Sequence, residues 1–239
     1  MPKLTIFHTN DFHNKLTAEK AWRIKDLKRS SPDSILLDAG DAIWAGNIFY
    51  RPGGEPILKL MSDVGYDAMA MGNREFHFLA SGLNQKIGWA KFPVLCANVR
   101  PTGEAKLPVK SHIIIERNGL VVAILGLTVP MITERMLSRK VSSFVFYDPI
   151  EAATRIVPEL RKQADFVIAL THIGLEADRK LALTVAGIDL IVGGHTHATL
   201  DQPEIIGRTA IVQAGWYARS IGKIEIDPSG VVRGEILQL

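Results

Sequence analysis

Residues 4–13 read LTIFHTNDFH, an apolar run followed by a polar cluster. Its first half, Leu4–His8, is a short apolar run of the kind that forms a buried strand. Its second half is polar and contains Asp11 and His13, whose side chains can bind metal ions. In α/β folds the carboxyl ends of the strands form the ligand-binding crevice, so this junction predicts a site as well as a strand.

The same junction of apolar run and polar cluster recurs four more times. The further stretches are SILLDAGD at 34–41, AMAMGNRE at 68–75, FVIALTH at 166–172 and LIVGGHTH at 190–197. Taken singly, a strand-end Asp or Asn predicts a turn or a helix cap, and a single His predicts a partly buried structural imidazole. Together, the five junctions predict one metal site built from Asp11, His13, Asp41, Asn73, His172, His195 and His197. His8 and His112 lie inside strand patterns and are predicted to be structural.

Strand patterns alternate with helix patterns along the rest of the chain, which predicts an α/β fold with mixed sheets in a single domain, 1–239. Further β-rich runs lie at 94–97, 112–115, 121–127, 210–213, 223–226 and 231–237. The last two flank Asp227-Pro-Ser-Gly230, which predicts a hairpin turn. The clearest helix is capped by Asp148 and runs to about Lys162, although Pro158 predicts a kink or an early end.

Composition limits the function classes. Of 239 residues, 47% are hydrophobic, which is ample for a core, and the formal net charge is +3. The densest basic group, 20–29, falls on a predicted helix whose other face carries Trp22, Ile24 and Leu27. This pattern indicates a solvated helix face, so a nucleic-acid partner is not expected. The single cysteine, Cys96, lies in an apolar run and predicts a buried, unreactive thiol.

The sequence also predicts where in the cell the protein is located. No apolar run is long enough to cross a membrane, so no membrane partner is expected. The first residues, MPKLTIFHTND, enter a strand pattern at once and contain no signal peptide, which predicts a cytoplasmic location. A secreted chain whose signal had been removed would read the same.

The chemistry of the seven candidate ligands narrows the choice of metal. Mixed oxygen and imidazole ligands suit Mn²⁺, Zn²⁺ or Fe better than Ca²⁺ or Mg²⁺. Seven ligands are too many for one zinc ion and suit two divalent metal ions. Two ions bridged by a carboxylate lie roughly 3.5–4 Å apart, where they can clamp a phosphoryl oxygen.

The motifs HTNDFH, DAGD, GNREF, THIG and GGHTH, in this order, resemble the calcineurin-like metallophosphoesterase superfamily, and most closely its 5′-nucleotidase branch. The resemblance implies a four-layer αββα sandwich with the site at the carboxyl edge of its sheets. It implies that Asp11, His13, Asp41 and His197 hold one metal, and that Asp41, as the bridge, Asn73, His172 and His195 hold the other. A hydroxide between the metals would then attack phosphorus in line.

Two departures from the family pattern affect the expected activity. Where the family motif reads Gly-Asn-His-Glu and then Phe-Asp, with His and Asp as a catalytic dyad, this chain has Arg74 and His77. If a helix begins at Glu75, Arg74 and His77 share one face, and His77 could supply the proton that Arg74 cannot. The alternative is a weakened enzyme in which both residues are merely tolerated. Relatives that act on nucleotides also carry a C-terminal domain that grips the base, whereas here Trp216 and Tyr217 could line the pocket or simply pack.

The sequence therefore predicts a dinuclear metal phosphoesterase that acts on a small phosphorylated substrate, with a nucleotide as one candidate. One alternative is a hydrolase of cyclic phosphodiesters, pyrophosphates or sulfur oxyanion esters on the same scaffold. Another is a metal-dependent module that binds a phosphorylated ligand without turnover. A nuclease is less favoured, because no continuous basic stripe or aromatic ladder accompanies the site.

Overall fold

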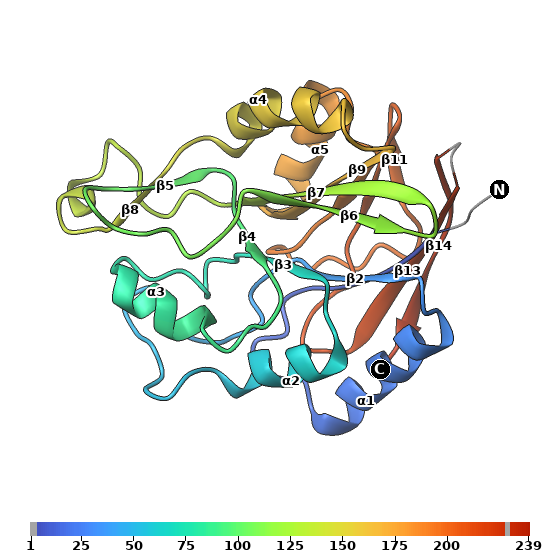
Figure 1. Ribbon diagram of the computed structural model, residues 1–239, viewed down its shortest axis with the longest axis horizontal. Helices are drawn as coiled ribbons and strands as arrows, with labels where there is room; N and C mark the ends of the chain where they lie inside the picture. The colour runs from blue at the N-terminus through green and yellow to red at the C-terminus, as the bar shows by residue number, and fades with distance from the viewer. Residues whose placement is uncertain (1–3, 228–229) are drawn as a thin grey trace.

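Two six-stranded sheets lie face to face in the computed structural model, which describes residues 4–227 and 230–239 (Figure 1). The first, in the order β14-β13-β1-β2-β3-β4, comprises β1 (Leu4–Thr9), β2 (Ile35–Asp38), β3 (Ala68–Ala70), β4 (Val94–Leu95), β13 (Ser220–Asp227) and β14 (Gly230–Gln238). The second, in the order β11-β12-β10-β9-β7-β6, comprises β6 (His112–Arg117), β7 (Leu120–Thr128), β9 (Phe166–His172), β10 (Leu190–Val192), β11 (Glu204–Ile206) and β12 (Thr209–Val212). A small sheet pairs β5 (Val99–Pro101) with β8 (Phe144–Phe146), and a 3₁₀ helix, η1, spans Leu137–Lys140.

Helices cover the outer face of each large sheet (Figure 1). The first sheet packs against α1 (Ala18–Ser30), α2 (Pro56–Val64) and α3 (Ala80–Ile87), and the second against α4 (Pro149–Arg161) and α5 (Leu175–Thr184). Alternate side chains of β1 enter different layers, since Ile6 packs between the two sheets and Phe7 packs against the helices. The chain thus forms the four-layer αββα sandwich expected from the resemblance.

Parallel pairing brings the polar ends of β1, β2 and β3 to one edge of the first sheet and those of β9 and β10 to one edge of the second, and contacts such as that between His172 and Ala39 join the two edges. In the first sheet, neighbouring strands pair in parallel from β1 through β2 and β3 to β4. In the second sheet, they pair in parallel from β7 through β9 and β10 to β12. The strands β2, β9 and β10 are buried along their whole length because another layer covers each face. The loops after β1, β2, β3, β9 and β10 therefore leave the sandwich close together.

The strand and hairpin predictions agree well with the structure. All the strands predicted from the sequence are present, with ends that differ by a few residues, and β13 pairs with β14 as an antiparallel hairpin. Within the predicted hairpin turn, Pro228 and Ser229 lie outside the described residues. The structure adds β5, β8 and β11, each of three residues, which are too short to give a periodic signal.

Two helix predictions are wrong in part. The helix α4 has the predicted extent, from the cap Asp148 to Arg161, but it does not end early at Pro158, because Val157 and Leu160 on either side of the proline are buried against the second sheet. In α1, Ile24 is buried as predicted, but Trp22 is 64% exposed. Residues two apart lie on nearly opposite sides of a helix, so Trp22 cannot share the buried face of Ile24.

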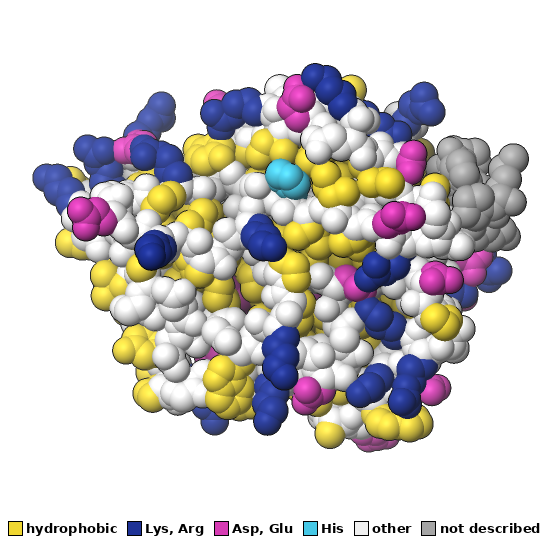
Figure 2. Space-filling model, in the orientation of Figure 1, with side chains coloured by type: hydrophobic (Ala, Val, Ile, Leu, Met, Phe, Trp, Pro, Cys, Tyr) yellow, Lys and Arg dark blue, Asp and Glu magenta, His cyan; other side chains and the backbone are white. Residues whose placement is uncertain are grey.

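The helices and the surface limit the kinds of partner. Among the described residues, the longest helices have 13 residues, and none is both long and apolar enough to cross a bilayer. Figure 2 shows Lys and Arg side chains spread over this face among acidic and apolar ones, without a continuous basic stripe. Cys96 is buried, as predicted, and burial raises the pKa of its thiol.

Candidate metal centre

Backbone hydrogen bonds tie the loops after β1 and β2 together. The N–H of Asp11 donates to the carbonyl of Gly40 at 2.9 Å, and the N–H of His13 donates to the carbonyl of Asp41 at 2.9 Å. The N–H of Tyr217, just before β13, donates to the carbonyl of Asp11 at 2.9 Å. These hydrogen bonds therefore hold Asp11, His13 and Asp41, which come from two strand ends, in fixed positions relative to one another.

One group of ligand atoms gathers around Asp11. Its Oδ1 lies 3.3 Å from Nε2 of His197 and 3.7 Å from Nε2 of His13, and the two Nε2 atoms are 3.1 Å apart. Its Oδ2 instead accepts a hydrogen bond from the N–H of His195 at 2.9 Å, which fixes the orientation of the carboxylate. Asp11, His13 and His197 thus present atoms that lie within 4.8 Å of one another.

A second group gathers around His172. Its Nε2 lies 3.4 Å from Oδ1 of Asp41 and 3.2 Å from Oδ1 of Asn73, and Nδ1 of His195 lies 3.1 Å from the same Asn73 oxygen. Its Nδ1 lies 2.8 Å from the carbonyl of Ala39, which can only accept, so Nδ1 carries the proton and Nε2 presents its lone pair. The structure therefore brings all seven candidate ligands together. Asp11, Asp41 and His172 also form a cluster within 4.8 Å, so Asp11 contributes to both groups.

The backbone at the candidate ligands is strained. Five of the seven have φ in the left-handed region: Asp11 (54°), His13 (46°), Asp41 (56°), His195 (77°) and His197 (58°). Such a conformation costs a non-glycine residue on the order of 1 kcal/mol and persists where surrounding contacts enforce it, typically at functional sites. The fold, rather than local preference, holds these side chains in position.

Two glycines allow the loops to approach one another. A Cβ atom at Gly72 would lie 2.3 Å from Oδ1 of Asp41, and one at Gly194 would lie 2.9 Å from the carbonyl oxygen of Ala39. Neither contact is compatible with a side chain, so glycine is required at both positions for the ligands to converge.

Two buried residues that the sequence analysis did not assign to the site support the ligands. Asn10 donates from Nδ2 to Oδ2 of Asp11 at 2.8 Å and accepts from the N–H of Ala214 at 2.9 Å. Glu75 accepts from the N–H of Asp41 at 2.9 Å and from the N–H of Gly72 at 2.8 Å. Both lie within two residues of predicted ligands inside the quoted motifs, and that position is the signal that could have found them.

Negative charge accumulates in the centre. Burial alone would lower the pKa of His172, but the carboxylates of Asp41, Asp11 and Glu75 outweigh it and raise the pKa to about 10. The Asp11 carboxylate, whose Oδ1 lies 3.3 Å from Nε2 of His197, likewise raises the pKa of His197. A field that attracts protons to imidazoles also attracts divalent cations, which compete with protons for the same lone pairs.

The residues of the centre fit divalent metal ions. Although it is buried, Oδ1 of Asp11 accepts no hydrogen bond from any described residue. A buried carboxylate oxygen without a donor is costly unless a cation compensates its charge. The set of imidazole nitrogens with carboxylate and amide oxygens, without a thiolate, is suited to Mn²⁺, Zn²⁺ or Fe.

Arg74 lies at the centre. Its backbone N–H donates to Oδ1 of Asp41 at 2.7 Å, and its Nε lies 3.9 Å from Oδ2 of the same carboxylate. Its guanidinium carbon lies 5.4 Å from the ring centroid of Trp44. A fixed positive charge thus lies directly beside a candidate ligand.

The structure does not bring His77 to the cluster. The segment 72–79 forms turns and α3 begins only at Ala80, so the expected helix from Glu75 with Arg74 and His77 on one face is wrong. The carboxylate of Glu75 binds backbone N–H groups of the preceding loops and keeps the segment from winding into a helix.

The contacts of His77 are those of a structural residue. It is 2% exposed, and its Nδ1 accepts from the N–H of Leu79 at 3.0 Å. Its ring contacts the rings of Tyr50 and Phe78 at centroid distances of 5.5 and 5.0 Å. Burial lowers its pKa.

Aromatic side chains surround the first group of ligands. The ring of His13 lies edge-on to Trp44 at 5.2 Å and to Tyr217 at 5.6 Å, and the ring of His197 stacks on Trp216 at 5.7 Å. Trp216 and Tyr217 thus lie against candidate ligands, and a role in lining the substrate pocket stays a prediction. Trp44 was not singled out from the sequence, because nothing in its local pattern marks it.

Comparison with known sequences identifies relatives. The profile of the Calcineurin-like phosphoesterase family matches residues 4–199. The chain is 33% identical to the trifunctional nucleotide phosphoesterase protein YfkN of Bacillus subtilis, over 96% of this chain and 18% of that protein. It is 31% identical to the 5′-nucleotidase of Rattus norvegicus, over 96% of this chain and 47% of that protein. The chain therefore spans about half the length of the curated relatives it matches, or less.

Solved structures of other proteins superpose on almost the whole of this chain. The 5′-nucleotidase precursor from Thermus thermophilus superposes with a TM-score of 0.84 at 27% identity, over 99% of this chain and 54% of that chain. The NAD nucleotidase of Haemophilus influenzae superposes with a TM-score of 0.80 over 99% of this chain and 55% of that chain, and at 24% identity it shows the fold alone. Because the family profile spans all five strand-end motifs that meet at the centre, this chain belongs to the calcineurin-like phosphoesterase family.

Proposed function

We propose that this chain is a metal-dependent hydrolase of small phosphorylated molecules, with nucleotides as the first candidates. The observation that carries the proposal is the convergence of seven ligand-type side chains from five strand ends. Relatives named 5′-nucleotidase and nucleotide phosphoesterase support a nucleotide as the substrate. The single-domain organisation and the cytoplasmic location stay predictions from the sequence.

The ligand assignment is the one that the family resemblance implies, with Asp41 shared by both ions; in the structure Asp11 also has atoms in both groups. Asp11, His13, Asp41 and His197 would hold one ion, and Asp41, Asn73, His172 and His195 would hold the other. Bound there, two divalent ions would polarise phosphoryl oxygens and acidify a water molecule for attack on phosphorus.

The protein's own residues supply orientation and charge. Arg74 is a permanent cation beside Asp41, and its guanidinium is placed to bind a phosphoryl oxygen and to stabilise the charge that develops in the transition state. We assign His77 a structural role, because its ring is packed against Tyr50 and Phe78 and not against any candidate ligand.

The test uses the purified, metal-stripped chain after Mn²⁺, Zn²⁺ or Mg²⁺ is added back. Hydrolysis of an aryl phosphate, an aryl phosphodiester and AMP is measured, and bound metal is counted by elemental analysis. The matched variant is Asp41→Asn, which keeps the size of the side chain but removes its charge. We expect metal-dependent hydrolysis that is lost in the variant, together with reduced metal binding.

The other outcomes are equally informative. Two bound metals without turnover of any phosphate would favour a binding module. A chain that binds no divalent metal would contradict the proposal of a metal-dependent hydrolase.

A further inference from the structure

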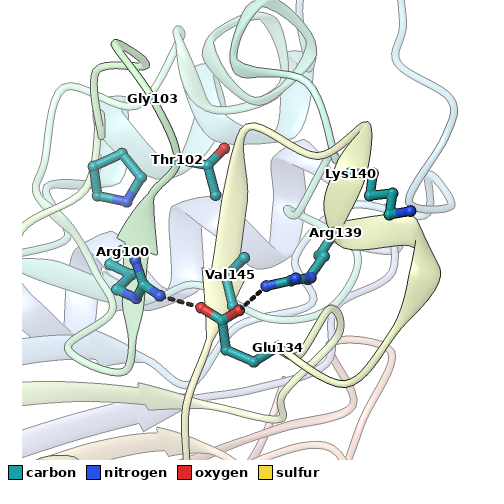
Figure 3. A pocket seen from close by; sticks show the side chains of 8 residues that line it. Arg100, Thr102, Gly103, Glu134, Arg139, Lys140 and Val145 are labelled. Atoms are coloured by element: carbon teal, nitrogen blue, oxygen red, sulfur yellow. Dashed lines mark hydrogen bonds and ion pairs between the residues drawn. The ribbon is translucent and has the colours of Figure 1, made fainter.

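Two neighbouring pockets of opposite character share the segment 138–141, which contains the end of η1. The first has a volume of about 320 Å³, and its apolar lining consists of Ile48, Phe76, Phe78, Ile132 and Val141. The second has a volume of about 340 Å³, and its charged lining consists of Arg100, Glu134, Arg139 and Lys140 (Figure 3). Neither pocket is lined by a candidate metal ligand, so both lie outside the centre described above.

The apolar pocket combines a buried floor with a rim that is exposed to water. Phe76 and Ile132 are buried, whereas Ile48 is 82% and Val141 is 66% exposed. Leu137, at the start of η1, is 83% exposed. Large apolar side chains that gather on a surface beside polar groups mark a site where a partner binds.

The basic pocket carries an excess of positive charge. Its one acid, Glu134, lies between two guanidinium groups and pairs with Arg100 and, at 2.6 Å, with Arg139 (Figure 3). Lys140 forms no ion pair with any of the residues that the structure describes. One carboxylate thus holds two guanidiniums in place while three cations line the pocket, so a ligand with carboxylates meets donors that are already oriented.

Backbone hydrogen bonds connect these pockets to a loop of the metal centre. The N–H of Ser143 donates to the carbonyl of Phe78 at 2.7 Å, and the N–H of Phe78 donates to the carbonyl of Asn47 at 3.3 Å. Asn47 belongs to the loop after β2, which also lines a cleft of about 520 Å³ beside the metal centre, together with Arg74. A partner seated on the two pockets would therefore contact a loop that borders the centre.

Charge and shape distinguish between the possible occupants. A second copy of the chain, related by a two-fold axis, would bring the same excess of positive charge to both sides of the contact, and like charges oppose association. A lipid surface would meet the exposed Ile48 and Leu137 but would leave the recessed Phe76 and Ile132 uncovered. A protein segment with both apolar and acidic side chains fits both pockets.

We propose that this surface docks a partner protein through a segment that inserts an aliphatic or aromatic side chain into the apolar pocket and places carboxylates against Arg100, Arg139 and Lys140. The apolar side chain supplies most of the affinity, and the carboxylates supply orientation and specificity. The inference concerns a surface outside the metal centre and does not depend on the proposed hydrolase function.

The experiment selects peptides that bind the full chain from a displayed random library and measures their affinities by fluorescence polarisation. The variants are Lys140→Glu and Val141→Asp, and both positions are exposed. The matched controls are Lys59→Glu, exposed on α2, and Leu183→Asp, 76% exposed on α5. We expect the selected peptides to combine an apolar residue with several acidic ones. Each variant should weaken their binding by about tenfold or more, as for the loss of one charge-assisted contact, and the controls should bind like the wild-type chain.

The unfolding temperature of each variant separates loss of binding from loss of the fold, and we expect all four to match the wild-type chain. A selection that enriches no peptide, or only peptides without acidic residues, would overturn the inference. Equal affinity for the variants and the controls would do the same. Self-association that Val141→Asp abolishes would assign the surface to a second copy instead, and variant-sensitive binding to phosphatidylcholine vesicles containing phosphatidylserine would assign it to a membrane.

Discussion

Glu75 shows how a single buried carboxylate organises this site. It accepts hydrogen bonds from the N–H groups of Asp41, Gly72 and Ile43, which belong to two different strand-end loops. Burial, aided by the nearby charge of Asp41, raises its pKa to about 7. The residue contributes no ligand atom to either group and acts by positioning those that do.

The variant Glu75→Gln tests this role. The amide replaces one acceptor oxygen by an NH₂ group that faces backbone donors, so we expect a loss of about 1–3 kcal/mol in the free energy of unfolding and weaker metal binding. Denaturant unfolding and metal titration measure the two effects. Glu159→Gln, at an exposed position on α4, is the control. A stability equal to that of the control would contradict the positioning role.

His77 and Arg74 should respond differently to substitution. His77→Ala leaves a cavity among Tyr50, Phe78 and Gly82 and should cost about 2–4 kcal/mol of stability, while the folded fraction keeps about the wild-type turnover. The variant Arg74→Gln is expected to behave in the opposite way: its turnover should fall by about 10²-fold, while its free energy of unfolding should change little. Paired unfolding curves and initial rates, corrected for folded fraction, check both. A large loss of turnover in folded His77→Ala would restore it as a catalytic candidate.

At the scale of elements, α3 is attached to the site by one side chain. The fully buried ammonium of Lys86 donates to the carbonyls of Gly46, Arg74 and Phe76, at 2.7, 2.7 and 2.6 Å. Burial lowers its pKa to about 8. The helix thereby fixes the loop after β2 to the loop after β3, and these loops form the cleft beside the metal centre.

The substitution Lys86→Met removes this connection while keeping most of the side-chain volume. Three buried carbonyls lose their charged donor, so we expect stability to fall by about 1–3 kcal/mol. Lys91→Met, at an exposed position, is the control. Urea unfolding measures the difference, and equal stabilities of the two variants would contradict the connecting role.

At the scale of the whole molecule, the packing of the two sheets determines the state of His8. The ring is 1% exposed, lies over Gly222 of β13, and its nitrogens have no hydrogen-bond partner among the described residues. Burial lowers its pKa from 6.5 to about 3. The folded chain therefore keeps His8 neutral over a pH range in which the unfolded chain protonates it.

This difference predicts an acid-dependent loss of stability. Below pH 6.5 the unfolded state binds a proton that the folded state binds only near pH 3, so stability is lost as the pH falls through this window. The contribution of His8 approaches about 1.4 kcal/mol per pH unit. The free energy of unfolding is measured as a function of pH, with a chelator present, for the wild-type chain and for His8→Phe. The difference between the two isolates the contribution of His8, because both chains share every other titrating group. A difference between them that does not vary with pH would contradict the prediction.

The fold class and the candidate ligands could both be predicted from local patterns in the sequence. Apolar strand runs ending in polar clusters are local signals, and parallel strands necessarily place their carboxyl ends at one edge. The seven candidate residues could therefore be named from the sequence, whereas their convergence from two sheets depends on how the sheets pack. The short strands β5, β8 and β11 were not predicted from the sequence, whereas the equally short β3 and β10 were.

The surroundings of the candidate ligands could not be predicted, because they form through contacts between distant segments. The turn at 72–79 depends on the Glu75 carboxylate reaching N–H groups more than thirty residues earlier, at Asp41 and Ile43, so a local helix pattern misplaced His77. Trp44 became part of the site through contacts across loops that no periodicity encodes. Ligand identity is a property of residue type at a strand end, whereas the charge and shape of the pocket arise from contacts between distant segments, and these exist only in the folded chain.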